Sequence, residues 1–584
     1  MYLEKIKSPE DVKSLGINEM KSLSDEMRKA LLEKLSKHGG HIGPNLGMVE
    51  ATIALHYVFN SPVDKIVFDV SHQCYCHKML TGRADAFLYE EKYDDVSGYS
   101  NPEESEHDFF TIGHTSTSVS LACGLAKGRD AKGENGNVIA VIGDGSLSGG
   151  EALEALDFAG EMDTNLIIVV NDNDMSIAEN HGGLYKNLKF LRDTDGKAEL
   201  NFFKSLNLDY VFVKDGNNLE ELIKAFKSVK DSKSPVVVHI CTEKGKGYKF
   251  AEENKEVWHW GMPFDLETGK SRFSFDGDSY ASLTADYLLE KMKNDSKVMA
   301  VTSATPTVFG FTADKRKAAG KQFIDVGIAE ENAVALISGM AANGAKPVYG
   351  VYSTFIQRTY DQLSQDLCIN SNPATMIVFA GSVYGMNDVT HLGFFDIPLM
   401  SNIPNLVYLA PVCKEEYFAM LEWAIEQNRY PVAIRVPENN LFSSGKEYTA
   451  NYNDLNKYEI TESGKDVAVI ALGGFYQRGE KVVSLLKNHD INATLINPRY
   501  ITGIDSELLE KLKENHRVVV TLEDGVLDGG FGEKISRFYG NSDIKTINYG
   551  LKKEFADRYN AEELIKENRL TPEQITEDII EILK

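Results

Sequence analysis

The chain has 584 residues, with 62 Lys and Arg against 87 Asp and Glu, which gives a formal net charge of −25 at pH 7. Such an acidic surface repels phosphate backbones and anionic lipids, so the composition argues against nucleic acid and membrane surfaces as partners. The length exceeds what one hydrophobic core supports and predicts three or more domains. The sequence has no apolar run of about 20 residues, no signal-peptide core and only six cysteines, which together predict a cytoplasmic protein.

Apolar strand-like runs alternate with amphipathic segments along the chain, which is the pattern of parallel α/β domains. In the first part, the expected strands are 65–70, 137–144, 165–172 and 234–242. In the second part, they are 322–331, 346–355, 374–382 and 431–438. In the third part, they are 466–474, 493–500, 517–525 and 545–550.

Polar passages at 264–279 and 443–458 look like linkers between these parts. We therefore expect three domains, with the bounds 1–270, 280–445 and 457–584. In the first domain, a helix is expected at 149–162, with Leu153, Leu156 and Ala159 on one face.

Polar residues follow three of the strands expected in the first domain. The segments are Ser71-His72-Gln73, Gly143-Asp144-Gly145 and Asn171-Asp172-Asn173-Asp174. Ligands of open parallel sheets bind beyond the carboxyl ends of the strands, and the glycines beside Asp144 let backbone N–H groups approach an anion. Asp144 and Asn173 offer hard oxygen donors that suit Mg²⁺ with phosphate. The segments of Asp144 and Asn173 are each common in turns. Because both follow strands that are expected to be buried, together they predict a site for a metal and a phosphate.

A tight cluster of His72, Cys74, Cys76 and His77 raises the alternative of a zinc site. The spacing is too short for four side chains to converge easily, and no second Cys/His pair follows. We therefore do not expect zinc here.

The Gly-Asp-Gly triplet at 143–145 with the downstream Asn173 resembles the thiamine-diphosphate motif. The resemblance implies thiamine diphosphate and Mg²⁺ as cofactors, with the metal held by Asp144, Asn173 and the backbone carbonyl of Met175. Further cofactor-binding residues implied in this domain are His72, Gly113, His114, Thr115, Gly145 and Ser146.

The segment FIDVGIAEENAV, residues 323–334, resembles the D-x-x-I-A-E motif of the pyrimidine-binding domain in this family. The resemblance assigns the carboxyl against the pyrimidine ring to Glu330, with Glu331 as the alternative, and burial would raise its proton affinity. Tyr352 and Phe355 resemble the aromatic residues that receive that ring. Without the resemblance, Glu330 would be a helix N-terminal acid and both aromatics core residues.

The domain order resembles that of transketolase: a diphosphate-binding domain, a pyrimidine-binding domain and a transketolase-like third domain. This implies an α/β fold of three domains, each with a mainly parallel sheet, of the transketolase-like thiamine-diphosphate-binding type. Almost the whole chain resembles the 1-deoxy-D-xylulose-5-phosphate synthase family, most clearly at 39–60, 68–83, 113–120, 171–180, 244–248, 351–362 and 390–396.

That family resemblance implies a transferase of isoprenoid and thiamine biosynthesis. Pyruvate would lose CO₂, and its remaining two-carbon unit would join glyceraldehyde 3-phosphate to give 1-deoxyxylulose 5-phosphate. The catalytic residues implied are Glu330, His41, His72 and His391, and the substrate-binding residues are His41, Tyr352, Arg358 and His391. His114 joins the histidines around the reacting carbons, where a side chain that titrates near neutral pH suits proton transfer. The resemblance also implies a homodimer whose third domain carries no chemistry, and leaves open whether each site uses one chain or two.

The chain departs from the family pattern in four places. The segment between 177–185 and 200–213 is short, and Asn387 replaces an acid, although Asp388 is adjacent. Two arginines expected to bind the acceptor phosphate are replaced by Ala380 and Glu438.

Alanine offers no charge to phosphate and glutamate repels it, so the aldehyde acceptor is left open. Arg358, Lys244 and Lys246 are candidates to compensate. One alternative is a transketolase-like enzyme with another donor or acceptor, which CO₂ release from pyruvate would test. Another is a non-catalytic paralogue, but a protein without the chemistry need not keep Asp144, Asn173 and Glu330.

Overall fold

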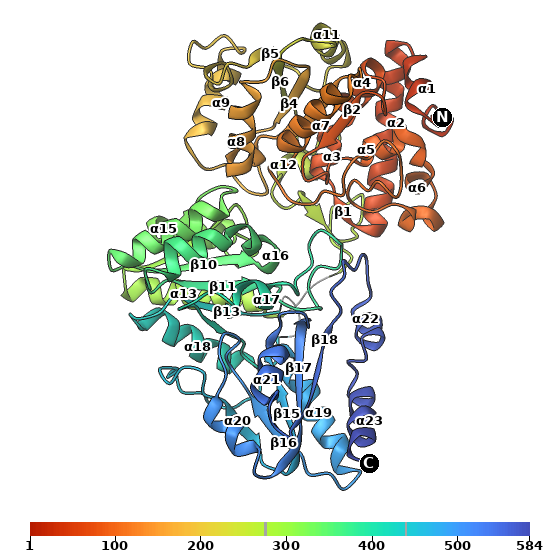
Figure 1. The fold of residues 1–584 in the computed structure, drawn as a ribbon. Coiled ribbons are helices and arrows are strands. Elements are labelled where there is room, and N and C mark those ends of the chain that lie inside the picture. The colour runs from red at the N-terminus through yellow and green to blue at the C-terminus, as the bar shows by residue number, and fades with distance from the viewer. Residues whose placement is uncertain (274–276, 438–440) are drawn as a thin grey trace. The chain divides into compact units, whose positions relative to one another are not determined.

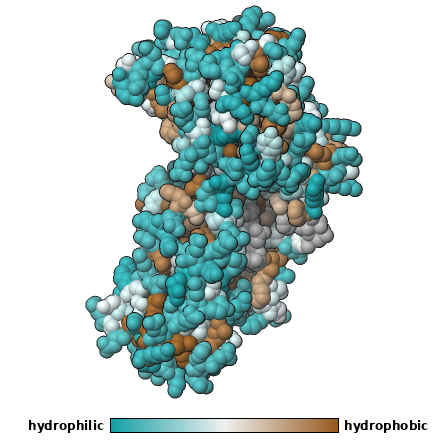
Figure 2. All heavy atoms as spheres, turned by 90° about the vertical axis from the view of Figure 1, so that its right-hand side faces the viewer, coloured by the Kyte–Doolittle hydropathy of each residue, from teal (hydrophilic) through white to brown (hydrophobic). Residues whose placement is uncertain are grey.

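The structure is a computed structural model that describes residues 1–273, 277–437 and 441–584. The chain divides into two compact units, Met1–Asp276 with Gly327–Ala329, and Gly277–Val326 with Glu330–Lys584. Their sheets are mainly parallel and covered by helices, which confirms the predicted α/β class (Figure 1). No helix in the described part of the chain is both long and apolar enough to span a membrane. Hydrophilic residues dominate the face shown in Figure 2, in keeping with the charge of −25.

A five-stranded parallel sheet with the order β2-β3-β4-β6-β5 forms the centre of the first unit. Side chains of β3 alternate between two hydrophobic clusters, Ile139 and Val141 in one and Ala140 and Ile142 in the other. The sheet is therefore buried on both faces, as expected for parallel strands with continuous apolar runs. The strands are β2 (Lys65–Phe68), β3 (Val138–Gly143), β4 (Leu166–Asp172), β5 (Asp209–Val213) and β6 (Pro235–Cys241).

Helices and one small ribbon complete this unit. The ribbon pairs β1 (Gly40–His41) with β7 (Trp260–Gly261) in antiparallel fashion. The helices are α1 (Pro9–Lys13), α2 (Ile17–His38), α3 (Gly43–Gly47), α4 (Val49–Val58), α5 (Tyr75–Lys78), α6 (Asp85–Leu88), α7 (Ser118–Lys132), α8 (Gly150–Ala159), α9 (Gly183–Asp193), α10 (Phe202–Ser205), α11 (Leu219–Val229) and α12 (Lys249–Glu253).

The face predicted for α8 from Leu153, Leu156 and Ala159 is only partly buried. Leu156 and Ala159 are buried, but Leu153 is 38% exposed. Ala152 and Ala155 complete the buried face instead. Small alanine side chains at this spacing turn toward the sheet, which leaves the larger Leu153 at the surface.

The second unit contains a six-stranded parallel sheet with the order β12-β13-β11-β10-β8-β9. The expected strand at 322–331 is too long, because β9 ends at Asp325 and Glu330 begins a helix. The strands are β8 (Val298–Thr302), β9 (Phe323–Asp325), β10 (Lys346–Tyr352), β11 (Thr375–Phe379), β12 (Val407–Leu409) and β13 (Val432–Arg435). The helices are α13 (Tyr280–Asn294), α14 (Ala313–Ala319), α15 (Glu330–Ala342), α16 (Ser353–Ile356), α17 (Asp396–Met400) and α18 (Lys414–Glu426).

A further five-stranded sheet with the order β14-β16-β15-β17-β18 belongs to the same unit, and only its edge strand β14 runs antiparallel. One hydrophobic cluster includes Val301 of β8 and Val519 of β17, so the two sheets share a core. The strands are β14 (Glu459–Glu462), β15 (Asp466–Ala471), β16 (Thr494–Asn497), β17 (His516–Val526) and β18 (Lys545–Leu551). The helices are α19 (Tyr476–Lys487), α20 (Ser506–Leu512), α21 (Phe531–Tyr539), α22 (Ala561–Glu567) and α23 (Pro572–Leu583).

Candidate active site

Two oxygen donors meet where β3 and β4 end in the first unit. Asp144 follows β3 and is 1% exposed, and its carboxylate accepts a hydrogen bond from the backbone N–H of Asn173, which follows β4. Nδ2 of Asn180 donates to Oδ2 of Asp144 over 2.7 Å. Oδ1 of Asn173 is buried and has no hydrogen-bond partner within the described part of the chain. The structure therefore brings these two predicted residues together and leaves an oxygen of Asn173 available.

The charges around Asp144 suit a bound cation and an anion. Burial, with a further contribution from the charge of Asp172, raises the pKa of Asp144 to about 8. Lys244 is also buried, its Nζ donates to the Ser176 carbonyl over 2.6 Å, and burial lowers its pKa to about 8. Because isolated buried charges are costly, a divalent cation at Asp144 and a phosphate near Lys244 would stabilise both groups.

Close backbone packing shapes the loops that carry these residues. A Cβ atom on Gly145 would lie 2.6 Å from Cβ of Ser176, so only glycine allows the contact. The hydroxyl of Tyr185 donates to the Gly145 carbonyl over 3.1 Å, and that of Ser116 donates to the Ser146 carbonyl over 2.8 Å. Met175 lies in the facing loop, where it forms an isolated bridge with Glu179.

The buried carboxylate of Asp69, just after β2, holds the loop of Gly113, His114 and Thr115. It accepts the backbone N–H groups of Ser116 and Ser118, each over 2.9 Å. Gly113 is buried, whereas His114 and Thr115 are half-buried. The hydrogen bond from Ser116 to Ser146 links this loop to the Gly-Asp-Gly segment.

Three imidazole rings form a cluster in the first unit. The ring centroids of His41 and His72 are 5.0 Å apart. The ring centroid of His259 lies 5.7 Å from that of His41 and 5.3 Å from that of His72. Nδ2 of the buried Asn45 lies 2.8 Å from the carbonyl oxygens of both His41 and His72. Asn45 therefore ties the two predicted histidines to each other.

His259 is a candidate functional residue that the sequence prediction missed. It precedes β7, and the pairing of His41 with Trp260 brings it to the cluster. Burial, together with the charges of Lys244, His72 and His41, lowers its pKa well below the usual value. Its Nδ1 atom is buried without a hydrogen-bond partner among the described residues. His259 thus presents a neutral ring nitrogen, and its place between two tryptophans was the only local signal.

The buried acid of the second unit is Glu330, at the first position of α15. It is 4% exposed, whereas Glu331 is half-buried. Its Oε2 atom has no hydrogen-bond partner in the described ranges and lies 4.0 Å from Nη1 of Arg358. Burial raises the pKa of Glu330 to about 7, although the charge of Arg358 opposes that shift. The side chain can therefore hold or release a proton near neutral pH.

Tyr352, Phe355 and His391 form a row of rings in the same unit. The ring centroids of Tyr352 and Phe355 are 5.8 Å apart, and those of Phe355 and His391 are 5.7 Å apart. Nδ1 of His391 lies 3.2 Å from Oδ1 of Asp388. Burial opposes ionisation of Asp388, but the hydrogen bond and charge of His391 keep its pKa below the usual value. Asp388 thus supplies the acid expected near His391, and Asn387 does not.

The departures from the family pattern have different surroundings. Ala380 is 4% exposed with φ at 55°, and its carbonyl accepts a hydrogen bond from Ser353. Glu438 lies outside the described residues. Nζ of Lys246 lies 3.9 Å from a carboxylate oxygen of Glu243. Ala380 offers an acceptor phosphate no charge.

In the cluster of His72, Cys74, Cys76 and His77, the side chain of His77 contacts other protein groups. His77 lies between Nε2 of His56 and Oδ1 of Asp108, each at 2.9 Å. Cys74 and Cys76 are fully buried, and burial raises the pKa of the Cys74 thiol to about 12.

A different set of ligand-type side chains meets beside β4. Asp172, His239 and Cys241 are the one group of three such residues that converge within the described ranges. Nη1 of Arg192 lies 2.7 Å from both carboxylate oxygens of Asp172. Arg192 already balances that carboxylate, so we assign no metal there.

Comparisons with known proteins agree along the chain. Residues 3–201 and 195–242 match the family described as 1-deoxy-D-xylulose-5-phosphate synthase. Residues 279–443 match the transketolase pyrimidine binding domain, and residues 456–575 match the transketolase C-terminal domain.

Similar full-length proteins carry the same name. The 1-deoxy-D-xylulose-5-phosphate synthase of Caldanaerobacter subterraneus subsp. tengcongensis is 39% identical over 625 residues, covering 100% of this chain and 99% of that protein. The one from Clostridium tetani is 38% identical over 619 residues, covering 100% of this chain and 99% of that protein.

A solved transketolase from Leishmania mexicana aligns over 96% of this chain and 97% of its own chain, at 15% identity and a TM-score of 0.44.

The chain belongs to the 1-deoxy-D-xylulose-5-phosphate synthase family. The predicted family and the predicted class of transferase enzyme are therefore confirmed.

Proposed function

We propose that this chain joins the two-carbon unit of pyruvate to glyceraldehyde 3-phosphate, releasing CO₂ and giving 1-deoxyxylulose 5-phosphate. The burial of two carboxyl groups, Asp144 at 1% exposed and Glu330 at 4% exposed, is the observation that carries the proposal. Relatives up to 39% identical over the full length bear the name of this reaction. Thiamine diphosphate, when bound, supplies the carbon nucleophile for decarboxylation and carbon–carbon bond formation.

The residues of the first unit would hold the cofactor's charged end. Asp144, Asn173 and the Met175 carbonyl offer oxygen ligands to Mg²⁺. Oδ1 of Asn173, which has no hydrogen-bond partner among the described residues, fits that role. The ammonium group of Lys244 would balance a diphosphate oxygen. Gly113, His114, Thr115, Gly145 and Ser146 line the loops around these ligands and would contact the cofactor.

The residues of the second unit would serve the pyrimidine ring and the substrates. Glu330 would exchange a proton with a ring nitrogen, since its pKa of about 7 matches neutral conditions. Tyr352 and Phe355 offer aromatic surface to a flat ring. His391, oriented by Asp388, would transfer protons to the substrate, and Arg358 would attract its charge.

His41 and His72 of the first unit are proposed to stabilise oxygen atoms of the substrate. Their rings contact each other and His259, so the three imidazoles form one polar surface. Neutral and protonated imidazoles can accept or donate at such a surface.

The domain bounds remain 1–270, 280–445 and 457–584 as part of this proposal. The family matches at 279–443 and 456–575 support the second and third domains. A cytoplasmic location is also proposed, because all six cysteines are free thiols.

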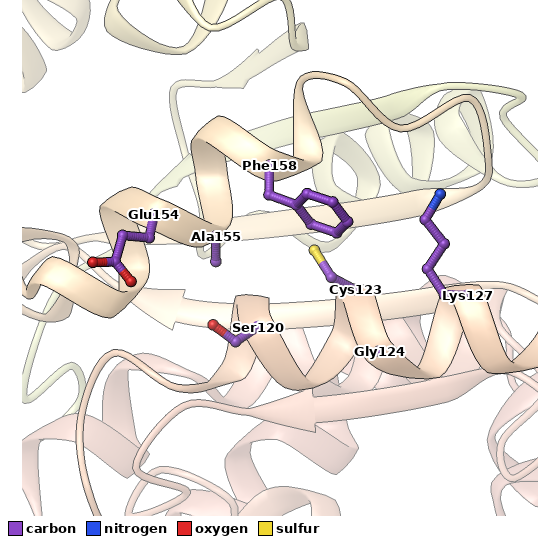
Figure 3. Close-up of a pocket in the computed structure, with 7 residues that line it drawn as sticks. All are labelled: Ser120, Cys123, Gly124, Lys127, Glu154, Ala155 and Phe158. Atoms are coloured by element: carbon purple, nitrogen blue, oxygen red, sulfur yellow. The ribbon is translucent and has the colours of Figure 1, made fainter.

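We also propose a homodimer. A cavity of about 380 Å³ lies between α7 and α8, where Phe158 points toward Cys123 (Figure 3). Phe158 and Leu153 of α8 are exposed, and the two helices carry opposite charges in Lys127 and Glu154. A second copy could cover this apolar surface and pair the charges. A sedimentation measurement of the wild type and Phe158→Lys tests this: a dimer should dissociate in the variant.

The test of function is product identification with pyruvate and a panel of phosphorylated and unphosphorylated aldehydes. CO₂ release with formation of 1-deoxyxylulose 5-phosphate is expected. A second candidate is the same chemistry with another acceptor, favoured by the uncharged Ala380. A lower KM for an unphosphorylated aldehyde would support that candidate, and no CO₂ from pyruvate with any acceptor would contradict both.

A further inference from the structure

The segment that follows β18 contacts the loop that carries His391. This loop, residues 380–395, connects β11 to α17, and the contacting segment, residues 552–560, connects β18 to α22. Both belong to the second unit. We call them the His391 loop and the clamp segment.

The residues on both sides of Asp388 donate hydrogen bonds to the clamp segment. Nδ2 of Asn387 donates to the Tyr559 carbonyl over 2.9 Å. The backbone N–H of Val389 donates to Oδ1 of Asp557 over 3.1 Å. The residues immediately before and after Asp388 are therefore both held by the clamp segment.

Tyr559 also binds the first part of the His391 loop through hydrogen bonds. Its hydroxyl lies 2.9 Å from the Val383 carbonyl oxygen and 3.2 Å from that of Met386. The ring centroids of Tyr559 and Phe394 are 6.3 Å apart. Burial and the charge of Asp388 raise the pKa of Tyr559, so the hydroxyl stays protonated and can donate.

Asp388 in turn orients His391. Its Oδ1 atom lies 3.2 Å from Nδ1 of His391 and accepts the backbone N–H of Thr390 over 3.0 Å. Oγ1 of Thr390 also lies 2.8 Å from Nδ1 of His391, so Asp388 and Thr390 together restrain the plane of the imidazole. Any shift of residues 387–389 would therefore move the ring of His391.

We propose that Asp557 and Tyr559 are positioning residues, through which the third domain sets the orientation of Asp388 and His391. This inference rests on the proposed function for its effect on turnover. It adds a positioning role to the third domain, which was expected to carry no chemistry, since the clamp segment lies beyond residue 457. Neither residue needs to touch the substrate.

Asp557→Ala and Asp557→Asn form the central comparison. Alanine removes the acceptor for the Val389 N–H, whereas asparagine keeps an oxygen in place. We expect Asp557→Ala to lower kcat about tenfold with KM for pyruvate nearly unchanged, because one hydrogen bond and the geometry it fixes are lost. Asp557→Asn should recover most of kcat, and Glu554→Ala, an exposed change in the same segment, should match the wild type.

Hydrogen–deuterium exchange of the full chain without substrate gives a second measurement. Peptides covering residues 383–391 should exchange faster in Asp557→Ala and in Tyr559→Phe than in the wild type or Glu554→Ala. This measurement needs no turnover, so it decides the positioning role even if the wild type lacks the proposed activity. If Asp557→Ala fails to fold, as a melting curve would show, Tyr559→Phe gives both measurements.

The proposal is overturned if exchange at 383–391 is unchanged in the folded variants. It is equally overturned if an active wild type loses no kcat in either Asp557→Ala or Tyr559→Phe. Equal loss in Asp557→Ala and Asp557→Asn would also contradict it, since the oxygen acceptor would then be irrelevant.

Discussion

Nη1 of Arg358 lies 4.0 Å from Oε2 of Glu330, yet burial still raises the pKa of this carboxyl to about 7. At this distance the charge of the guanidinium lowers the pKa, while Oε2 of Glu330 has no hydrogen-bond partner among the described residues. Glu330 therefore remains able to exchange a proton with a ligand near neutral pH.

Removing the acid from Glu330 should stop turnover but not cofactor binding. Glu330→Gln keeps the size of the side chain and loses its titratable proton, so we expect kcat to fall at least about 100-fold. Steady-state kinetics and calorimetric titration with thiamine diphosphate measure the two effects. Activity equal to that of the wild type would remove Glu330 from this role.

The same residue should leave a signature in stability. The pKa of Glu330 is raised from 4.5 to about 7, so its ionisation destabilises the fold as pH rises through that window. Without cofactor, Glu330→Gln should gain stability over the wild type between about pH 5 and 7 and keep that gain above it, at most on the order of 3 kcal/mol. Thermal melts at several pH values measure this. Glu331→Gln is the matched control, and a gain for Glu330→Gln that is the same at all pH values would contradict the assignment.

Asp144 should be required for binding of the metal and cofactor. Asp144→Asn removes the negative charge from the two oxygen donors, Asp144 and Asn173. We expect the affinity for thiamine diphosphate with Mg²⁺ to fall about 100-fold or more. Titration calorimetry with and without Mg²⁺ measures it. Asp163→Asn, at an exposed position, should bind like the wild type. Equal affinities for the two variants would exclude Asp144 as a ligand.

His259 should contribute to turnover although the sequence prediction did not include it. Its Nδ1 atom has no hydrogen-bond partner in the part of the chain that the structure describes, and its ring contacts those of His41 and His72. We expect His259→Ala to lower kcat about 100-fold, as for loss of a positioned proton-transfer group. His489→Ala, on an exposed imidazole, is the control. A kcat within twofold of the wild type would show that His259 has a packing role and does not contribute to turnover.

The sequence predicted the strands that are long and continuously apolar. Strands such as β3 and β4 are buried on both faces, and their composition therefore differs clearly from that of helices. The predictions did not include β1, β5, β7, β8, β12 or β14. β12 has three residues and β14 is an edge strand with Ile460 exposed, so neither carries a strong pattern.

The site was predictable where its residues are close together in short motifs. Asp144, Asn173 and Glu330 were named from such motifs; Asp144 and Glu330 are buried, and Asn173 is half-buried. His259 and the clamp segment depend on pairings between distant parts of the chain, β1 with β7 and residues 383–391 with 557–559. Such contacts leave no periodic pattern, so only the folded chain reveals them.

The central proposal is that Asp144 and Asn173 bind the metal of thiamine diphosphate and that Glu330 binds its pyrimidine ring. A crystal structure of the chain with thiamine diphosphate and Mg²⁺ tests this most directly. The account predicts oxygen atoms of Asp144 and Asn173 at about 2.1 Å from the metal, and the Glu330 carboxyl within hydrogen-bonding distance of a ring nitrogen. A metal bound by other residues, or a pyrimidine ring out of reach of Glu330, would contradict it.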